Sequence, residues 1–400
     1  MPGGRRSSRR RAALAANLGV ALAGLALIGL AAAAGRDWAD RHFLPTFAWS
    51  RSFQIALIDA LRVLLALVAL LLILFVRPRV ARSVKAGKGG RLFVSSLSAA
   101  LAVAAALATT EGILHTRTWL ATQERWGGKE PLRRRDDVTG WMFVPDHHGQ
   151  AVIDGRTIDY ATDRFGYRVA RAGDQTDFGR PTILFAGESV IHGYGLQWGE
   201  TIGAQVQAMT GIAIANIAVN AHATDQTYMR LRRELPRFAH PVAVIVPFVP
   251  LLFDRNLDQD RPYLDSSLRW HAAHPPELRL VELGRRILRY RSEEAVDEGV
   301  ATTQAVLRAT IALARARGAQ SLIVVPQFLP EEPTETAIRR RVLDAAHLPY
   351  LLVPLDPAWR LAVDRHPDPR GARVIAAAVA RALAGAGQGG PNPPAGQAAR

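Results

Sequence analysis

Three long apolar stretches near the start of the chain constrain its fold more than any other feature. They cover residues 12–34, 53–76 and 92–109, and each is about the length that a helix needs to cross a bilayer. The second contains Asp59 and Arg62, which share one helical face and can pair with each other. The third is rich in Ala and Ser, which suits a close-packed membrane helix or a buried helix of a soluble protein. The sequence thus predicts three transmembrane helices.

Charge is distributed around these stretches as in a membrane protein. Residues 1–11 and 77–91 hold eleven Lys or Arg residues and no acidic residue, in a chain of 400 residues with a net charge of +15. Because cytoplasmic loops collect positive charge, we expect a multi-pass protein of the cytoplasmic membrane with residues 115–400 outside. Alternatively, residues 1–34 are a cleaved signal peptide, which also places the remainder outside. Since the basic clusters flank apolar helices, we do not expect nucleic acid as a partner.

After the membrane region, residues 1–110, short apolar runs alternate with helical patterns. We expect a polar connector at 111–180, a folded domain at 181–385 with an insertion at 254–300, and a disordered tail at 386–400. Five apolar runs are typical of buried strands, at 183–186, 212–219, 242–249, 321–325 and 350–355. Helical patterns lie at 201–209, 227–233, 302–317, 334–346 and 371–384. This alternation predicts an α/β domain whose parallel sheet is covered on both faces.

Two segments near the ends of this domain contain the residue types of a serine hydrolase. Ser189 follows the first apolar run in the sequence Gly187-Glu188-Ser189, at the carboxyl end of a strand, where ligands bind in open α/β sheets. Asp364 and His366 lie two residues apart before the last helix, so the carboxylate can orient the imidazole while its other nitrogen faces a nucleophile. Taken singly, each segment also fits an N-cap serine or a solvated turn. Together they predict a catalytic triad.

These segments resemble those of the SGNH/GDSL hydrolase family, which has a G-D-S block near the start of its domain and a D-x-H-P block near its end. The end block here reads Asp364-Arg365-His366-Pro367. Residues 136–141, 144–146 and 162–168 resemble the connector of membrane-attached bacterial envelope members, and residues 216–226 resemble the second family block. The resemblance covers residues 136–385. It implies a flavodoxin-like three-layer α/β/α domain with a mainly parallel five-stranded sheet, and ester chemistry without a cofactor.

Three positions depart from the family pattern. Glu188 replaces the aspartate beside the nucleophile, which keeps the charge. Ala221 replaces the glycine of the second block, which keeps a backbone N–H but narrows the tolerated backbone geometry. The oxyanion-hole asparagine of the third block falls near Leu251, which cannot donate a hydrogen bond. The oxyanion donors that remain to be expected are the backbone N–H groups of Ser189 and Ala221 and the side chain of Asn220 or Asn256.

The sequence therefore favours a membrane-anchored serine esterase that acts on an ester, such as an O-acetyl group, of an envelope carbohydrate or lipid. Its partners would be the lipid bilayer and this substrate. The alternatives are an O-acyltransferase to a sugar hydroxyl and a non-catalytic envelope binding or assembly protein of the same fold. Loss of one oxyanion donor costs about 3–4 kcal/mol of transition-state stabilisation, so we expect slow turnover. The chain has no cysteine, and Asp146-His147-His148 lacks a further suitably spaced ligand, so we expect no metal site.

Overall fold

The structure is a computed structural model and describes residues 3–45, 50–125, 130–274, 278–287, 289–362 and 365–386. The chain forms two compact units, which are described separately. The first comprises Met1–Leu44, Ala48–Trp119 and Glu277–Arg291, and the second Pro45–Phe47, Leu120–Pro276 and Ser292–Arg400. Asp364 and all but the first residue of the predicted tail 386–400 lie outside the described residues.

The first unit is helical, as the apolar stretches predict. It contains α1 (Gly3–Ala33), α2 (Arg36–His42), α3 (Arg51–Leu71), the π-helical turn η1 (Leu72–Val76), α4 (Arg77–Lys85), α5 (Gly89–Arg125) and α9 (Arg279–Ile287). Three helical segments among the described residues are long and apolar enough to cross a membrane: Arg10–Ala33, Arg51–Lys85 and Gly89–Thr116. Helix α5 extends well beyond the predicted stretch 92–109, because residues 110–125 contain no proline and a single glycine.

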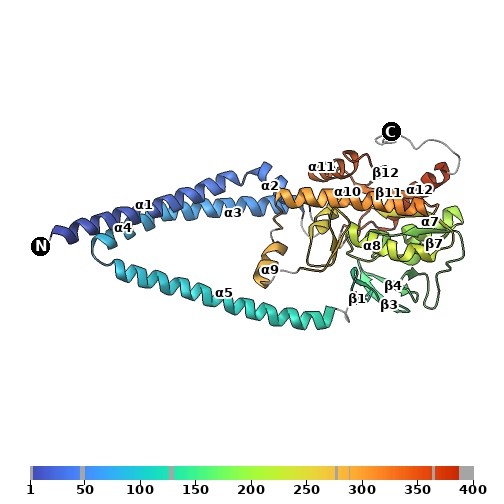
Figure 1. The fold of residues 1–400 in the computed structure, drawn as a ribbon, viewed down its shortest axis with the longest axis horizontal. Helices are drawn as coiled ribbons and strands as arrows, with labels where there is room; N and C mark the ends of the chain where they lie inside the picture. The colour runs from blue at the N-terminus through green and yellow to red at the C-terminus, as the bar shows by residue number, and fades with distance from the viewer. Residues whose placement is uncertain are drawn as a thin grey trace. The chain divides into compact units, whose positions relative to one another are not determined.

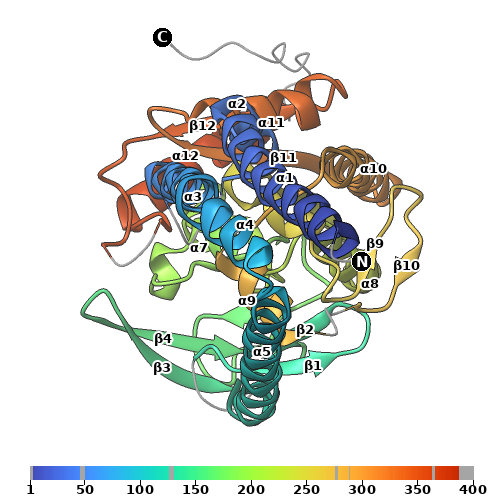
Figure 2. The same ribbon diagram turned by 90° about the vertical axis from the view of Figure 1, so that its left-hand side faces the viewer.

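Helix α1 packs along α3 and α4, as Figures 1 and 2 both show. Gly24 permits this contact, because a Cβ atom there would lie 2.5 Å from the side chain of Ile73. Small residues of this kind let helix backbones approach each other in membranes. Arg62 donates to the carbonyl of Ala31 and to the Asp59 carboxylate, both at 2.9 Å. The two charges that share a helical face therefore do pair.

The second unit is built on an eight-stranded sheet, so the expected count of five strands is wrong. The strands are β3 (His148–Ile153), β4 (Arg156–Thr162), β5 (Arg168–Val169), β6 (Thr182–Phe185), β7 (Ala213–Asn216), β8 (Pro241–Pro247), β11 (Gln320–Phe328) and β12 (Tyr350–Leu355), in the order β12-β11-β8-β6-β7-β5-β4-β3. From β12 to β7 they pair in parallel and match the five predicted runs. The antiparallel strands β5, β4 and β3 come from the connector. They were missed because β3, for instance, alternates exposed and half-buried residues, without the continuous apolar run of a buried strand.

Helices cover both faces of the parallel strands. Ile183 and Phe185 of β6 belong to a core that includes residues of α7 (Ile202–Thr210) and α12 (Pro369–Ala386). Leu184, also fully buried, points to the opposite face, since side chains alternate along a strand. There α8 (Thr224–Glu234) and α10 (Glu293–Ala316) pack together, and α10 packs on β11. Figure 2 shows the two helix pairs on opposite sides of the sheet.

The remaining elements are short and lie mainly at turns and in the insertion. They are the hairpin of β1 (Arg133–Asp136) and β2 (Gly140–Phe143), α6 (Ser189–His192), η2 (Trp198–Glu200), η3 (Leu235–Arg237), η4 (Pro250–Leu257), β9 (Tyr263–Leu264), β10 (Trp270–His271), α11 (Pro333–Arg339) and the π-helical η5 (Arg340–Asp344).

The strand order changes direction at β6. The chain passes from β6 to β7 on one side and then crosses to β8 on the other, which creates the kind of switch point where open α/β sheets bind ligands. The turn after β6 begins at Gly187, where a Cβ atom would lie 2.7 Å from Pro247 at the end of β8. Glycine therefore allows the ends of β6 and β8 to approach each other two residues before Ser189.

Replacement of Gly187 by alanine tests this close approach. Because the new methyl group would overlap Pro247 and Ile191, we expect Gly187→Ala to destabilise the fold by about 1–3 kcal/mol. The melting temperature of the detergent-solubilised full chain should fall by several degrees. Gly199→Ala is the matched control, since a Cβ atom there would have no neighbour within 4 Å. Equal melting temperatures for the two variants would contradict the close approach.

Candidate active site

Ser189 lies at the switch point, as the first residue of α6, and is only 5% exposed. The preceding residue, Glu188, caps this short helix, because its carboxylate accepts a hydrogen bond from the backbone N–H of Val190 at 3.0 Å. The backbone N–H of Ser189 makes no hydrogen bond within the described part of the chain, as expected at the start of a helix. The hydroxyl and this free N–H therefore belong to the same residue at the carboxyl edge of the sheet.

His366 lies beside Ser189, with its Nε2 atom 2.7 Å from the serine Oγ atom. The loop that carries it is fixed by two backbone hydrogen bonds, from Leu361 N–H to the His366 carbonyl at 2.9 Å and from Asp368 N–H to the Trp359 carbonyl at 3.0 Å. The ring of Tyr194 packs against the imidazole at 4.8 Å. The structure thus brings the predicted nucleophile and base together, while the predicted acid Asp364 lies outside the described residues.

Glu188 makes a second contact that the sequence does not reveal. Its Oε2 atom lies 2.7 Å from the Oγ atom of Ser189, which is the distance from that oxygen to His366 as well. A serine hydroxyl has one proton, so it can donate to the carboxylate or to the imidazole but not to both. The donation to His366 is the one that general-base catalysis needs.

Residues 216–226, which resemble the second family block, lie next to the serine. The N–H of Val219 donates to the carbonyl of Gly187 at 3.0 Å, which ties the segment after β7 to the turn after β6. Ala221 follows with a φ of +66°, in the left-handed region that glycine adopts at no steric cost. Its N–H makes no hydrogen bond with any described residue. The backbone geometry expected of the family glycine is therefore present, although the residue is alanine.

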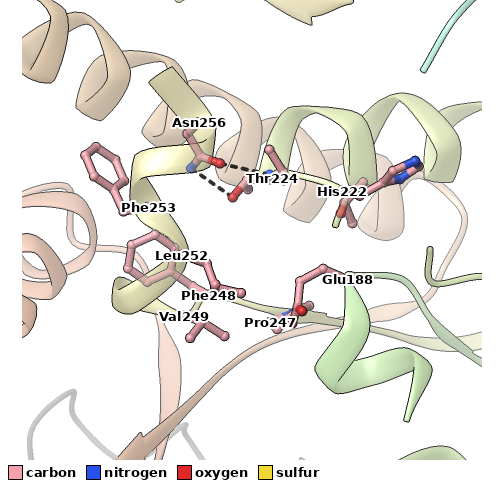
Figure 3. A pocket seen from close by; sticks show the side chains of 11 residues that line it. Glu188, His222, Thr224, Pro247, Phe248, Val249, Leu252, Phe253 and Asn256 are labelled. Carbon is pink, nitrogen blue, oxygen red and sulfur yellow. Dashed lines mark hydrogen bonds between the residues drawn. The ribbon is translucent and has the colours of Figure 1, made fainter. Parts of the chain in front are cut away.

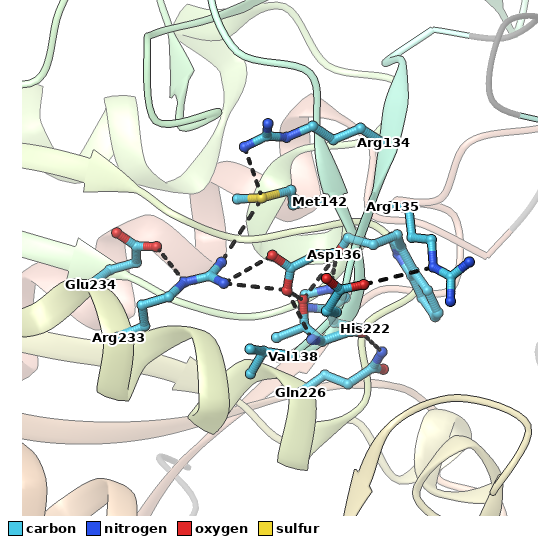
Figure 4. A network of polar contacts seen from close by, with 12 residues as sticks. Arg134, Arg135, Asp136, Val138, Met142, His222, Gln226, Arg233 and Glu234 are labelled. Carbon is cyan, nitrogen blue, oxygen red and sulfur yellow. Dashed lines mark hydrogen bonds and ion pairs between the residues drawn. The ribbon is translucent and has the colours of Figure 1, made fainter. Parts of the chain in front are cut away.

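The β1–β2 hairpin holds this block in place (Figure 4). The indole N–H of Trp141 donates to the carbonyl of Asn220 at 3.0 Å, and Nε2 of His222 lies 2.9 Å from the carbonyl of Trp141. The amide of Gln226 donates to the carbonyl of Thr139 at 2.5 Å. The residues on both sides of Ala221 are thus attached to the hairpin, which restricts where its N–H can point.

An ion pair attaches the same hairpin to α8. Arg233 donates to Asp136 at 2.9 Å and to Glu234 at 2.9 Å, as Figure 4 shows. The Asp136 carboxylate also accepts hydrogen bonds from the backbone and side chain of Thr139, at 2.8 and 2.7 Å. Burial raises the pKa of Asp136, but these hydrogen bonds and Arg233 outweigh it, so the pKa is lowered from its usual value. The carboxylate therefore stays ionised and keeps the hairpin closed at neutral pH.

Arg168 holds the segment that follows α6. Its guanidinium donates to the carbonyls of His192, Gly193 and Leu196 at 2.7, 2.6 and 2.6 Å, and lies over the ring of Tyr160 at 4.7 Å. Burial lowers the pKa of Arg168 to about 10, so it remains a cation at neutral pH. The glycines after Ser189 therefore serve a turn around this cation and not a dinucleotide-binding loop.

A pocket of about 330 Å³, counted with its open mouth, lies beside Glu188 (Figure 3). Its lining is mixed: the apolar part, Pro247, Phe248, Val249, Leu252 and Phe253, comes from the end of β8, the residues that follow it and η4, and His222, Ala223, Thr224, Thr227 and Asn256 complete it. Leu251, where we expected the missing asparagine, is not among the lining residues. Val249 and Leu252 lie there instead, so the third-block segment presents aliphatic side chains to the pocket.

The two candidate substitute donors differ. Asn256 is engaged, because its amide accepts from the N–H of Thr224 at 3.1 Å and donates to the hydroxyls of Thr224 and Thr303 at 3.0 and 2.9 Å. It therefore has a structural role. Asn220 is 4% exposed, and neither its Oδ1 atom nor its Nδ2 group, which would be the donor, has a hydrogen-bond partner in the described structure. Asn220 remains the side-chain candidate for an oxyanion donor.

Three other histidines, His192, His147 and His271, make no side-chain hydrogen bond with Ser189 within the described structure. His192 is fully buried between the rings of Phe143 and Tyr160, at 4.5 and 5.7 Å, and is not among the residues that line the pocket. His147 contacts Glu130 at 2.7 Å, and His271 contacts Asp265 at 2.9 Å. Burial lowers the pKa of His192 well below its usual value, so this ring is a neutral part of the core.

No protein-family model and no curated protein matches the chain. Solved structures that it resembles include lipolytic proteins of the G-D-S-L family and esterases. They include a carbohydrate acetylesterase from Sinorhizobium meliloti, with 12% identity, a TM-score of 0.34, and coverage of 52% of this chain and 100% of that chain. A member of the lipolytic G-D-S-L family from Veillonella parvula has 12% identity, a TM-score of 0.32, and coverage of 50% and 96%. An acetyl xylan esterase from the rumen bacterium Butyrivibrio proteoclasticus has 10% identity, a TM-score of 0.33, and coverage of 54% and 66%. Likeness at this level carries no argument about activity, which depends on the side chains described above.

The buried His222 predicts a pH dependence of stability. Burial lowers its pKa to about 3 from the usual 6.5, although the hydrogen bond to Trp141 opposes this shift. Between these two pH values the unfolded chain binds a proton that the folded chain does not. Stability should therefore fall as the pH falls from about 6.5 towards 3, by at most about 1.4 kcal/mol per pH unit for this group.

His222→Gln keeps a donor for the Trp141 carbonyl but does not titrate, so its unfolding free energy should fall less steeply over this range. Urea unfolding of the full chain at several pH values measures the slope. The exposed His240 provides the control, and His240→Gln should follow the wild-type curve. Parallel acid limbs for wild type and His222→Gln would contradict the buried neutral imidazole.

Proposed function

We propose that this chain is a membrane-anchored serine esterase that acts on an ester, such as an O-acetyl group, of an envelope carbohydrate or lipid. The observation that carries the proposal is the 2.7 Å contact between Ser189 Oγ and His366 Nε2, at the switch point of a parallel sheet. The strand order also supports the flavodoxin-like layering. When the five parallel strands are numbered by their order in the chain, they lie across the sheet in the order 2-1-3-4-5, from β7 to β12.

In the proposed reaction Ser189 attacks the ester carbonyl while His366 accepts its proton and returns it to the leaving alcohol. Asp364 orients the imidazole. The N–H groups of Ser189 and Ala221 hold the oxyanion, with Asn220 as a third candidate donor. Water then releases the acyl group from the serine. Transfer of the same group to a sugar hydroxyl would make the protein an O-acyltransferase.

The three apolar helices support an anchor in the cytoplasmic membrane, and the basic clusters around them support an extracytoplasmic domain. An anchor keeps the domain near a membrane-bound substrate and raises its effective concentration without any new contact in the site. This compensates for slow chemistry, which we expect because aliphatic Val249 and Leu252 line the pocket where the family has a donor.

Labelling with a fluorophosphonate probe tests the nucleophile, because only an activated serine reacts. The full chain in detergent should be labelled, Ser189→Ala should not be labelled at all, and His366→Ala should lose about 10²-fold or more in labelling rate. Ser321→Ala is a matched control, since that buried hydroxyl has no partner among the described residues and its loss should leave labelling unchanged. Labelling of Ser189→Ala at the wild-type rate would refute the assignment.

The next prediction concerns the hydroxyl proton of Ser189, for which Glu188 and His366 compete as acceptors. Aspartate at this position would still cap α6, but its shorter side chain would withdraw the carboxylate from the Ser189 hydroxyl and leave the proton to the imidazole. We therefore expect Glu188→Asp to raise kcat for a short-chain nitrophenyl ester several-fold, with KM little changed. A lower kcat in a variant that melts like the wild type would show that the glutamate assists the reaction.

The contact of Glu188 with Ser189 and the aliphatic pocket wall also favour one other candidate, a non-catalytic envelope binding protein on the same fold. In such a protein the carboxylate would hold the serine proton permanently. Folded wild type that is not labelled, with labelling restored in Glu188→Asp because the carboxylate is withdrawn, would favour this second function over the first.

A further inference from the structure

Helix α9 is a short amphipathic helix in the insertion, and aliphatic side chains at both edges of its apolar side are exposed. Val281 and Leu283 are 43% and 41% exposed, and Leu278, just before the helix, is 56% exposed. Large aliphatic side chains gathered on one short helix are unusual at a water-exposed surface. Residues 278–291 also contain five arginines against one glutamate. An apolar side beside dense positive charge is the pattern of helices that lie in a membrane interface.

The first end of this segment is fixed to α5. The carboxylate of Glu111 accepts hydrogen bonds from the backbone N–H groups of Arg279 and Leu280, at 2.6 and 2.8 Å. These are N–H groups at the start of α9, which have no partner inside the helix. Glu111 follows the predicted membrane stretch 92–109 by two residues. Helix α9 therefore begins where the third membrane helix leaves its apolar part.

The other end of the segment, residues 290–291, is fixed to α2. The backbone N–H of Arg291 donates to the carbonyl of His42 at 2.9 Å, and the imidazole of His42 lies 2.7 Å from the carbonyl of Arg291. The ring of Tyr290 stacks on those of His42 and Trp38, at 5.0 and 6.0 Å. These partners belong to α2, which directly follows the first membrane helix, and Trp and Tyr are typical of membrane–water interfaces.

Both attachments lie on the same side of the membrane. Three consecutive spans alternate in direction, so the carboxyl ends of the first and third spans, α1 and α5, reach the same face. A segment that joins α2 to residue 111 must run along that face. The exposed aliphatic side chains then lie at the depth where the hydrocarbon region begins, and the arginines at the depth of the headgroups.

We propose that α9 is an interfacial helix, with Leu278, Val281 and Leu283 in the acyl-chain boundary and the arginine-rich segment 278–291 at a surface of anionic lipid headgroups. The inference rests on the membrane anchor of the proposed function. Long arginine side chains can extend from such a helix to the phosphates while its apolar side remains buried. The segment comes from the middle of the esterase domain in the sequence, so the lipid surface contacts the chain beyond its three spans.

The absence of cysteine allows a direct test, because any introduced cysteine is unique. Val281→Cys and Leu283→Cys are labelled with an environment-sensitive fluorophore in the full chain and reconstituted in phosphatidylcholine vesicles with or without phosphatidylglycerol. Leu101→Cys, 62% exposed on α5, is the control inside the membrane, and Val152→Cys, 75% exposed on β3, is the control in water. Quenchers attached to lipid chains and dissolved iodide report the surroundings of each label.

We expect both α9 labels to be quenched by the lipid-borne group and protected from iodide by about threefold or more relative to Val152→Cys, with stronger protection in anionic vesicles. Open access of iodide to both α9 labels, with Leu101→Cys quenched by lipid, would overturn this inference and leave the anchor intact. Failure of the lipid quencher at Leu101→Cys would refute the anchor and the inference together. Protection of the α9 labels from both quenchers would overturn the inference, because it would show that protein covers the helix. Equal protection from iodide in vesicles with and without phosphatidylglycerol would refute the role of the arginines.

Discussion

The candidate active site depends on one buried cation, Arg168. Its guanidinium is 1% exposed and, within the described structure, makes no ion pair with a carboxylate. Its charge is compensated by three carbonyl groups of the turn after α6 and by the face of Tyr160. Arginine suits this position because its planar group donates in several fixed directions, whereas the ammonium of lysine is a compact point charge. The carbonyl groups at the end of α6 and in the following turn therefore face the guanidinium. These hydrogen bonds fix the chain directly after Ser189 and so help to position the serine.

The connector contributes directly to the structure of the candidate active site. Arg168 and Tyr160 come from its strands β5 and β4, and Trp141 comes from its hairpin. These residues support the two backbone segments that provide the proposed oxyanion donors. A parallel sheet alone would bring Ser189 and His366 to one edge, but it would leave the loops around them free to move. The polar hydrogen bonds of the connector remove that freedom.

The sequence predicts the features that rest on continuous patterns and misses those that rest on single contacts. The five parallel strands could be predicted because they are apolar on both faces. The proximity of Ser189 and His366 could be predicted because strand ends converge at one edge. The contact of Glu188 with the hydroxyl could not, since it depends on a side-chain rotamer. Which side chains of the third-block segment line the pocket could not be predicted either, because the chain winds into the 3₁₀ helix η4 shortly after β8 and presents Val249 and Leu252 there.

The left-handed conformation of Ala221 limits how this protein can evolve. An alanine codon is one base change from glycine, aspartate, valine and threonine, among others. Glycine and aspartate tolerate a positive φ, whereas the branched Cβ atoms of valine and threonine make it costly. Among these neighbours, glycine and aspartate are therefore tolerated at this position, whereas valine and threonine are selected against. A single base change also leads from alanine to glycine, so the unstrained residue can be reached without passing through a less favourable one.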